Sequence, residues 1–321
     1  MRFKQQVSLR RVCLKVTRFI DLDLSMYPSF ASSLFRRLGR NVWFKELGHG
    51  AGSTISSLGG RVCCLGNACT PRLLSEWSGA WFEPWNFLND IDGVHALNIA
   101  EKLMSSYTGL RLVVSSPDPL KILTAVFLSR RTDYHGNVVR WVKKVFSTHP
   151  NAATLRLLGG SLNTLSSSFQ VRQLAEVIRD VEEVAALSLS IDPWKLRERL
   201  LYIKYVGPKV ADAFLLFTGK GTVFTPADTH YQRLLRRLGL IPRARIPSKD
   251  VCLKYGPECT SCRLSGNCIT GLSISMFGRL SGFIQTLSYV HDKLVCGKAQ
   301  CNTCRLRGFC STPPSPRGLS T

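Results

Sequence analysis

The sequence lacks any long hydrophobic run. No stretch of the 321 residues approaches the roughly 18 consecutive apolar residues that a membrane-spanning helix needs. The basic N-terminus has no continuous apolar segment ahead of a small-residue cleavage site, so we do not interpret it as a secretory signal. We therefore expect an intracellular protein of the reducing cytoplasm or nucleoid, with no membrane partner.

Acidic residues are also scarce. Asp and Glu number 21 against 43 Lys and Arg, which gives a formal net charge of +22 and a pI near 9.9. Hydrophobic residues make up 45% of the chain, enough for a core, and this excludes disorder throughout. Residues 116–321 carry 29 of the basic and 13 of the acidic residues. A basic excess of this size favours a nucleic acid as the partner.

Eight of the 12 cysteines form two groups near the C-terminus. The first group has the spacing C-x6-C-x2-C-x5-C and the second C-x4-C-x2-C-x5-C, and Cys-Arg-Leu-x-Gly-x-Cys recurs in both as an internal repeat. Four thiolates suit either zinc or an iron–sulfur cluster, and the alternative for the second group is a decayed duplication. The two candidate metal sites are Cys252, Cys259, Cys262 and Cys268, and Cys296, Cys301, Cys304 and Cys310.

The other four cysteines are Cys13, Cys63, Cys64 and Cys69. Adjacent cysteines are poorly placed to chelate one metal ion. In a reducing compartment we expect these four to be small buried thiols rather than disulfides.

The hydrophobic pattern predicts an irregular first part and a helical second part. Residues 1–70 show little periodicity, with a loop or hairpin connection at 48–60 and a short strand at 61–65. We expect a helix over 87–107 and an extended segment over 110–114. After Asp118, an expected N-cap, apolar residues recur at helical spacing. The predicted helices are 119–131, 135–147, 152–158, 170–185, 193–203, 209–218 and 229–238.

Residues 196–239 hold the pattern richest in chemistry. One predicted helix ends near Ile203, a tight turn follows at 205–208, and a second helix opens at Lys209 or Val210. The free N–H groups and the dipole of the second helix favour a phosphate at this point.

Lys209 and Asp228 are the candidate catalytic residues in this segment. The helix N-terminus favours the neutral amine of Lys209, which can attack a sugar carbon and form a Schiff base. Asp228 could stabilise a cationic sugar or move a proton. The plainer alternatives are a solvated lysine and an N-cap aspartate, and the cap and catalytic roles of Asp228 are compatible.

These motifs resemble a known family. YVGPKVAD (205–212), the later DTH (228–230) and the first cysteine group are similar to the helix-hairpin-helix (HhH-GPD) DNA glycosylase superfamily, in its endonuclease III-like branch. Residues 118–133 resemble the first barrel helix of that superfamily. The resemblance covers roughly 110–270, with three separated motifs in the order of the family.

The resemblance implies site residues by matched position. Lys209 falls on the Schiff-base lysine of bifunctional glycosylase/lyases, and Asp228 on the catalytic aspartate. Cys252–Cys268 fall on the ligands of a [4Fe-4S] cluster. Arg130 and Arg131 lie near the residue that fills the gap left by a flipped base, with a solvated helix end as the alternative. The implied DNA contacts are Lys204, Tyr205, Val206, Gly207, Arg130, Arg131, His230 and Arg233.

Three features depart from the family pattern. The usual Pro-Gly-Val-Gly hairpin is Lys204-Tyr205-Val206-Gly207 here, so its first glycine is missing. The N-terminal extension is not typical of a minimal endonuclease III. Gly109-Leu110-Arg111, before the barrel, is similar to the junction in oxoguanine and alkyladenine glycosylases, which have an N-terminal β-rich domain. The second cysteine group is extra.

We therefore expect a mainly α protein with an α+β extension. The predicted organisation is an N-terminal extension at 1–114, with a β-rich domain as one interpretation, a helical barrel as catalytic core at 115–246, an iron–sulfur segment at 247–310 with one or two clusters, and a flexible tail at 311–321.

The expected function is base-excision repair. The resemblance implies a DNA glycosylase with AP-lyase activity that removes a damaged, oxidised base from double-stranded DNA as a monomer. Oxidised pyrimidine and 8-oxoguanine both remain open as the lesion. The alternative is a non-catalytic or redox-sensing DNA-binding protein with the same hairpin.

Overall fold

The computed structural model describes residues 9–148 and 166–311. The predicted helix at 152–158 and residues 312–321 of the predicted tail lie outside these ranges. The chain packs as two compact units. The first comprises residues 1–82, 109–189 and 217–219, and the second comprises 83–108, 190–216 and 220–321. No helix in the two described ranges is long and apolar enough to cross a membrane.

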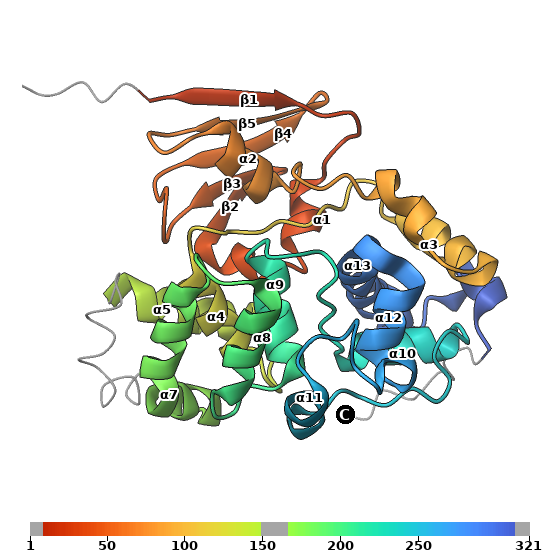
Figure 1. Ribbon diagram of the computed structural model, residues 1–321. Coiled ribbons are helices and arrows are strands. Elements are labelled where there is room, and N and C mark those ends of the chain that lie inside the picture. Colours follow the sequence, from red (N-terminus) through yellow and green to blue (C-terminus); the bar gives the residue numbers. More distant parts are fainter. Residues whose placement is uncertain (1–8, 149–165, 312–321) are drawn as a thin grey trace, which may run out of the picture. The chain divides into compact units, whose positions relative to one another are not determined.

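The first unit contains a five-stranded antiparallel sheet in the order β1-β5-β4-β3-β2 (Figure 1). Its inward face carries buried side chains such as Ile55, Val62 and Cys64. Helix α2 (Pro71–Ser78) packs against this sheet, and the indole of Trp77 is fully buried there. The strands are β1 (Arg11–Lys15), β2 (Phe35–Gly39), β3 (Val42–Lys45), β4 (Thr54–Leu58) and β5 (Arg61–Leu65). The predicted strand at 61–65 is confirmed.

The sheet corrects the prediction for the N-terminal cysteines. The register of β1 and β5 places Cys13 opposite Cys63, with Cα atoms 4.1 Å apart, and the two form a disulfide. A turn after β5 brings Cys69 back to Cys64, and these two also form a disulfide. The expectation of free buried thiols is therefore wrong. Sequence spacing does not reveal which residues face each other across strands.

Helices complete the first unit. Helix α4 (Pro119–Leu128) is buried from Ile122 to Leu128 and packs against α5 (Val139–Thr148) and α7 (Phe169–Leu187). Shorter elements are α1 (Leu22–Met26), a 3-10 helix η1 (Phe30–Leu34) and a π-helical turn η3 (Tyr134–Val138). The predicted helices 119–131 and 170–185 are confirmed, whereas 135–147 divides into η3 and α5.

Asp118 occupies the predicted N-cap position of α4 but makes no capping hydrogen bond. Its carboxylate instead accepts from Lys45 Nζ at 2.9 Å and from the His49 N–H at 2.7 Å. Lys45 is fully buried, with its ammonium 4.6 Å from the ring centre of Phe35. A buried ammonium needs an anionic partner, so the Asp118 carboxylate pairs with Lys45 instead of capping α4.

The second unit is helical. The predicted helix at 87–107 becomes a 3-10 helix η2 (Pro84–Asp90) and α3 (Val94–Ser106), separated by Gly93 at φ +87°. Predicted helices 193–203, 209–218 and 229–238 are confirmed as α8 (Pro193–Tyr202), α9 (Pro208–Phe217) and α10 (Thr229–Arg237). The later elements are α11 (Lys249–Tyr255), η5 (Ser265–Asn267), α12 (Ile269–Phe277), η6 (Gly278–Leu280), α13 (Ser281–Leu294), η7 (Cys296–Lys298), η8 (Cys301–Thr303) and η9 (Arg307–Phe309).

Candidate active site and cysteine sites

Helices α8 and α9 form the predicted helix–hairpin–helix. The Val206 N–H donates to the Ile203 carbonyl at 3.2 Å, and Lys249 Nζ donates to the same carbonyl at 2.9 Å. Pro208 opens α9, where a first turn tolerates proline because its N–H would have no helical partner. Lys209 therefore lies in the first turn of α9, half-buried, as the sequence predicts.

Tyr205 takes the conformation that a glycine would adopt more easily. Its φ is +67°, in the left-handed region, whereas Gly207 has no positive φ and has open space beside its Cα. An L-residue in this region costs about 1–2 kcal/mol. Val206, 1% exposed, anchors the hairpin in the core. The tight hairpin thus forms without the first glycine of the family pattern.

Asp228 is held at the start of α10 by two separate donors. One carboxylate oxygen accepts from the Tyr231 N–H at 2.7 Å, which confirms the N-cap prediction. The other accepts from Gln285 Nε2 at 3.2 Å. Gln285 belongs to α13 and is only 5% exposed. Both oxygens of Asp228 are therefore fixed by groups from two helices.

Lys209 and Asp228 interact electrostatically. Burial raises the pKa of Asp228, and the Lys209 ammonium acts on that pKa in the opposite direction. The hairpin and the start of α10 thus bring together an amine and a carboxylate that lie 19 positions apart in the sequence.

A close helix contact sets the loop that leads to Asp228. The Gly282 N–H of α13 donates to the Thr222 carbonyl at 2.8 Å. A Cβ on Gly282 would lie 2.6 Å from the Phe224 carbonyl oxygen, so only glycine allows this approach. The Phe224 ring is buried with its centre 4.8 Å from that of Trp194 in α8. This packing links the loop before Asp228 to both α8 and α13.

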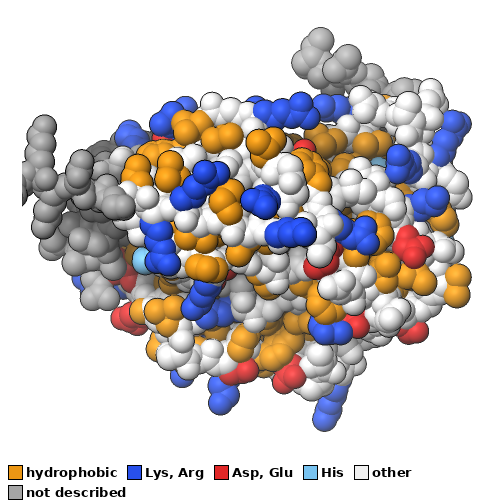
Figure 2. Space-filling view, turned by 90° about the horizontal axis from the view of Figure 1, so that it is seen from above, with side chains coloured by type: hydrophobic (Ala, Val, Ile, Leu, Met, Phe, Trp, Pro, Cys, Tyr) orange, Lys and Arg blue, Asp and Glu red, His pale blue; other side chains and the backbone are white. Residues whose placement is uncertain are grey.

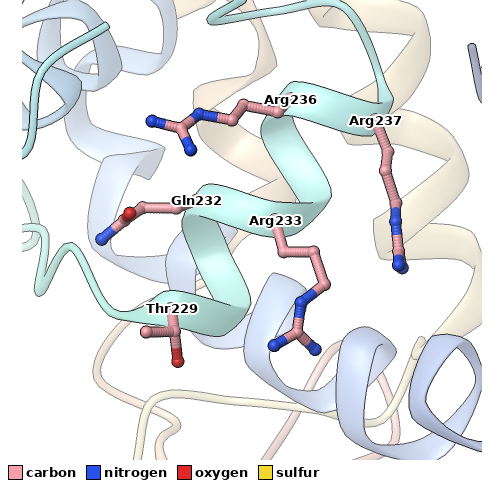
Figure 3. Close-up of a pocket in the computed structure, with 5 residues that line it drawn as sticks. All are labelled: Thr229, Gln232, Arg233, Arg236 and Arg237. Carbon is pink, nitrogen blue, oxygen red and sulfur yellow. The ribbon is translucent and has the colours of Figure 1, made fainter. Parts of the chain in front are cut away.

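Helix α10 carries a row of basic and polar side chains. His230 Nδ1 and Arg233 Nη1 lie 2.7 and 2.8 Å from the same oxygen of Asp292, which is buried in α13. Figure 3 shows Arg236 and Gln232 extending from one side of α10, whereas Arg233 and Arg237 extend from the other. An open pocket follows this helix and is lined by Thr229, Gln232, Arg233, Arg236 and Arg237.

The first cysteine group surrounds the end of α11 and the start of α12. Cys252 and Cys259 are buried, and Cys262 and Cys268 are half-buried, all as free thiols. Arg197 of α8 is fully buried, pairs with Asp212 at 2.5 Å and lies 4.0 Å from the Cys252 sulfur. Burial raises the pKa of the Cys252 thiol, while Arg197 acts to lower it. A buried guanidinium beside these sulfurs suits an anionic thiolate site.

No protein-family model matches the chain. Endonuclease III of Sulfolobus acidocaldarius is 38% identical over 76 residues, which are 24% of this chain and 32% of that protein.

Solved structures match over most of the chain. MBOgg1 with a low-affinity DNA ligand superimposes with a TM-score of 0.68 at 13% identity, over 88% of this chain and 95% of that one. The Clostridium acetobutylicum 8-oxoguanine glycosylase/lyase with dsDNA gives 0.64 at 17%, over the same shares. The 3-methyladenine DNA-glycosylase of Archaeoglobus fulgidus gives 0.59 at 14%, over 88% and 99%. The chain has the helix-hairpin-helix DNA glycosylase fold. The predicted fold class is thereby confirmed.

Within this glycosylase fold, the two wedge candidates differ. Arg130 folds back: its Nε donates to the Phe127 carbonyl at 2.8 Å, and its guanidinium lies 3.9 Å from the centre of the Phe127 ring. Arg131 is exposed and has a φ of +51°. Arg131 therefore remains the better placed of the two to contact a ligand.

The sequence did not reveal three residues that organise the site. Gln285 holds Asp228, Asp292 holds His230 and Arg233, and Arg197 faces the first cysteine group. All three are polar residues within apolar helical patterns, which is the one signal that could have marked them. Their partners lie far away in the sequence: 57 positions for Gln285, 59 and 62 for Asp292, and 55 between Arg197 and Cys252.

Proposed function

We propose that this protein is a base-excision DNA glycosylase with AP-lyase activity on damaged double-stranded DNA. The observation that carries the proposal is the placement of Lys209 in the first turn of α9, together with an Asp228 carboxylate that is held at the start of α10 by Tyr231 and Gln285. The named relatives include an endonuclease III and an 8-oxoguanine glycosylase/lyase, which supports the same chemistry.

In the first step Lys209 is the nucleophile. A damaged nucleotide leaves the base stack, and its sugar meets Nζ of Lys209. The Nζ–C1′ bond forms as the glycosidic bond breaks, and the base leaves with that electron pair. The Asp228 carboxylate stabilises the positive charge that develops on the sugar and accepts the proton that Nζ loses.

In the second step the strand is cut. Opening of the sugar ring gives an iminium ion between Nζ and C1′, which acidifies the proton on C2′. A base removes that proton, the C3′–O bond breaks, and the 3′ phosphate leaves with the electron pair. Water then hydrolyses the imine and returns the free amine of Lys209.

Phosphate contacts would come from the basic surface. Figure 2 shows Lys and Arg side chains spread over the viewed face, with acidic side chains more sparsely placed. Lys204, exposed in the hairpin, and Arg131 are candidate contacts. His230 and Arg233 are engaged by Asp292, so their DNA contacts would use the remaining donor positions. The monomeric state is part of this proposal.

The first cysteine group fits a [4Fe-4S] cluster. Cys252, Cys259, Cys262 and Cys268 would supply the four thiolates, and Arg197 faces the sulfurs with a positive charge. Bound there, the cluster would tie the loop between α11 and α12 to the hairpin, because Arg197 also donates to the Pro257 carbonyl at 2.6 Å. Its contribution would be structural.

The test is a panel of duplexes with one lesion each. We expect base release and strand nicking on an oxidised lesion, with 8-oxoguanine and thymine glycol as the first two candidates. Lys209→Gln should lose nicking, whereas Lys195→Gln, at an exposed position of α8, should keep it. Binding of abasic DNA without base release or nicking on any duplex would instead support the non-catalytic or redox-sensing alternative.

A further inference from the structure

The second cysteine group forms a built site in the second unit. Its four free thiols are half-buried and line one cavity, together with Leu234 of α10 and His291 of α13. Leu306, 1% exposed, closes the cavity from the cysteine segment itself. The group is therefore a set of converging side chains rather than a run of solvated cysteines. Its members are Cys296, Cys301, Cys304 and Cys310.

The two cysteine groups share one backbone scaffold. In the first, Ser265 N–H donates to the Cys262 carbonyl at 3.0 Å and Cys268 N–H to the Ser265 carbonyl at 3.2 Å. In the second, Arg307 N–H donates to the Cys304 carbonyl at 3.2 Å and Cys310 N–H to the Arg307 carbonyl at 3.2 Å. A short 3-10 helix precedes the last cysteine in both, η5 and η9. The sequence repeat is thus also a repeat in structure, and a decayed copy need not keep this geometry.

Each group also has an arginine–aspartate pair beside it. Arg197 and Asp212 lie at the first group, and Arg237 and Asp292 lie at the second, with Arg237 Nη1 3.6 Å from Asp292 Oδ1. Arg237 interacts with the Cys296 thiol. On the other side, His291 Nε2 lies 3.4 Å from the Cys304 sulfur. Hydrogen-bond donors next to the sulfurs stabilise cysteines that bind a metal as thiolates.

The match to the first cysteine group favours a cluster over one zinc ion. Each group has a single C-x2-C flanked by wider gaps, whereas structural zinc sites usually contain paired C-x2-C motifs. A [4Fe-4S] cluster takes four thiolates, which is the number that each group supplies.

We propose that Cys296, Cys301, Cys304 and Cys310 hold a second [4Fe-4S] cluster. Each thiol loses its proton as it binds iron. The cluster would fasten the C-terminal segment to α10 and α3, since the Ser311 N–H donates to the Arg237 carbonyl at 2.8 Å and Arg305 donates to the Ser105 carbonyl at 3.1 Å. Figure 1 shows this dark blue segment beside α3. The proposal goes beyond the glycosylase activity and does not depend on it.

The test counts metal in the full chain purified without oxygen. We expect about eight irons and eight sulfides per chain from elemental analysis and native mass spectrometry. Cys304→Ser and Cys262→Ser stand at matched positions of the repeat, and each should leave about four irons, with none left in the double variant. Cys69→Ser, outside both groups, should keep the full content.

Two results would overturn the proposal. One is a parent protein with about four irons that are retained in Cys304→Ser and lost in Cys262→Ser. The other is one zinc per chain that disappears in Cys304→Ser. The parent count decides between one and two clusters even where a serine variant fails to fold, and Cys310→Ser provides a second variant. Because no DNA is involved, the outcome is separate from that of the lesion panel.

Discussion

Asp228 has a structural role and a proposed catalytic role. As the N-cap of α10 it accepts from the Tyr231 N–H, and in the proposed mechanism it must also be charged and reachable by a substrate. A buried carboxylate is costly without compensation, and burial does raise the pKa of Asp228. Gln285 and Lys209 partly offset this cost.

Asp228→Asn should separate these two roles. Asparagine caps a helix about as well as aspartate, so α10 should stay intact. Loss of the charge should lower the single-turnover rate of base release by about 10²–10⁴-fold. Asp192→Asn, at the exposed N-cap of α8, is the matched control and should leave the rate unchanged.

The same variant has a predicted pH signature in stability. Because the pKa of Asp228 is raised on folding, the folded protein binds this proton more tightly than the unfolded chain does. The charged carboxylate thus costs stability at neutral pH, and this cost disappears as the pH falls through the raised pKa. In urea unfolding at pH 7.5, Asp228→Asn should be at least as stable as the parent, and its advantage should vanish in acid. A variant that is less stable at neutral pH and equal in acid would contradict this.

Helices α8 and α9 are joined by a buried ion pair. Arg197 and Asp212 are both fully buried, and Arg197 also reaches the Pro257 carbonyl of the first cysteine segment. Asp212 raises the pKa of Arg197 even though burial alone would lower it. The pair thus connects the helix–hairpin–helix with the cysteine loop.

Removing one partner leaves the other charge buried and unpaired. Arg197→Ala should therefore lower the free energy of unfolding by about 3–5 kcal/mol. Arg199→Ala, at an exposed position of the same helix, should change it by less than about 0.5 kcal/mol. Denaturant unfolding measures both, and equal losses in the two variants would argue against this role for the pair.

The hairpin offers a test of its left-handed residue. Tyr205→Gly removes the strain at φ +67° and should keep or raise stability by up to about 1 kcal/mol. Tyr205→Val places a β-branched side chain there and should lower stability by about 1–3 kcal/mol. If the valine variant were the more stable of the two by thermal unfolding, the left-handed assignment would be wrong.

Local sequence was enough to predict the elements with strong periodicity. Helices α7, α9 and α10 repeat apolar residues at helical spacing, and Pro208 and Asp228 mark two of their starts. Strands β1 to β4 were not predicted, because residues 1–70 show little periodicity in the sequence.

Features that depend on distant partners could not be predicted. The disulfide of Cys13 and Cys63 follows from strand register, and the lost cap at Asp118 follows from a lysine 73 positions earlier. The roles of Gln285 and Asp292 likewise come from the packing of α13 against α10. Lys209 and Asp228 could be named from their motifs, but their interaction needed the folded chain.

At the scale of the whole molecule, charge sets the expected mode of binding. With a net charge of +22, the protein should release counterions from every phosphate that it contacts. For about six to ten contacts, affinity for a duplex should fall by about 10³–10⁵-fold between 50 and 200 mM salt. Fluorescence anisotropy with an undamaged duplex measures this, and a change of less than about tenfold would show that phosphates contribute little.

Trapping of the covalent intermediate tests the central claim most directly. Borohydride reduces the imine between enzyme and sugar, so the parent protein, incubated with the duplex that it cleaves or with an abasic duplex, should form a stable adduct. Peptide mapping should place that adduct on Lys209, and Lys209→Gln should form none. An adduct on another residue, or one that survives Lys209→Gln undiminished, would contradict the assignment of Lys209 as the nucleophile.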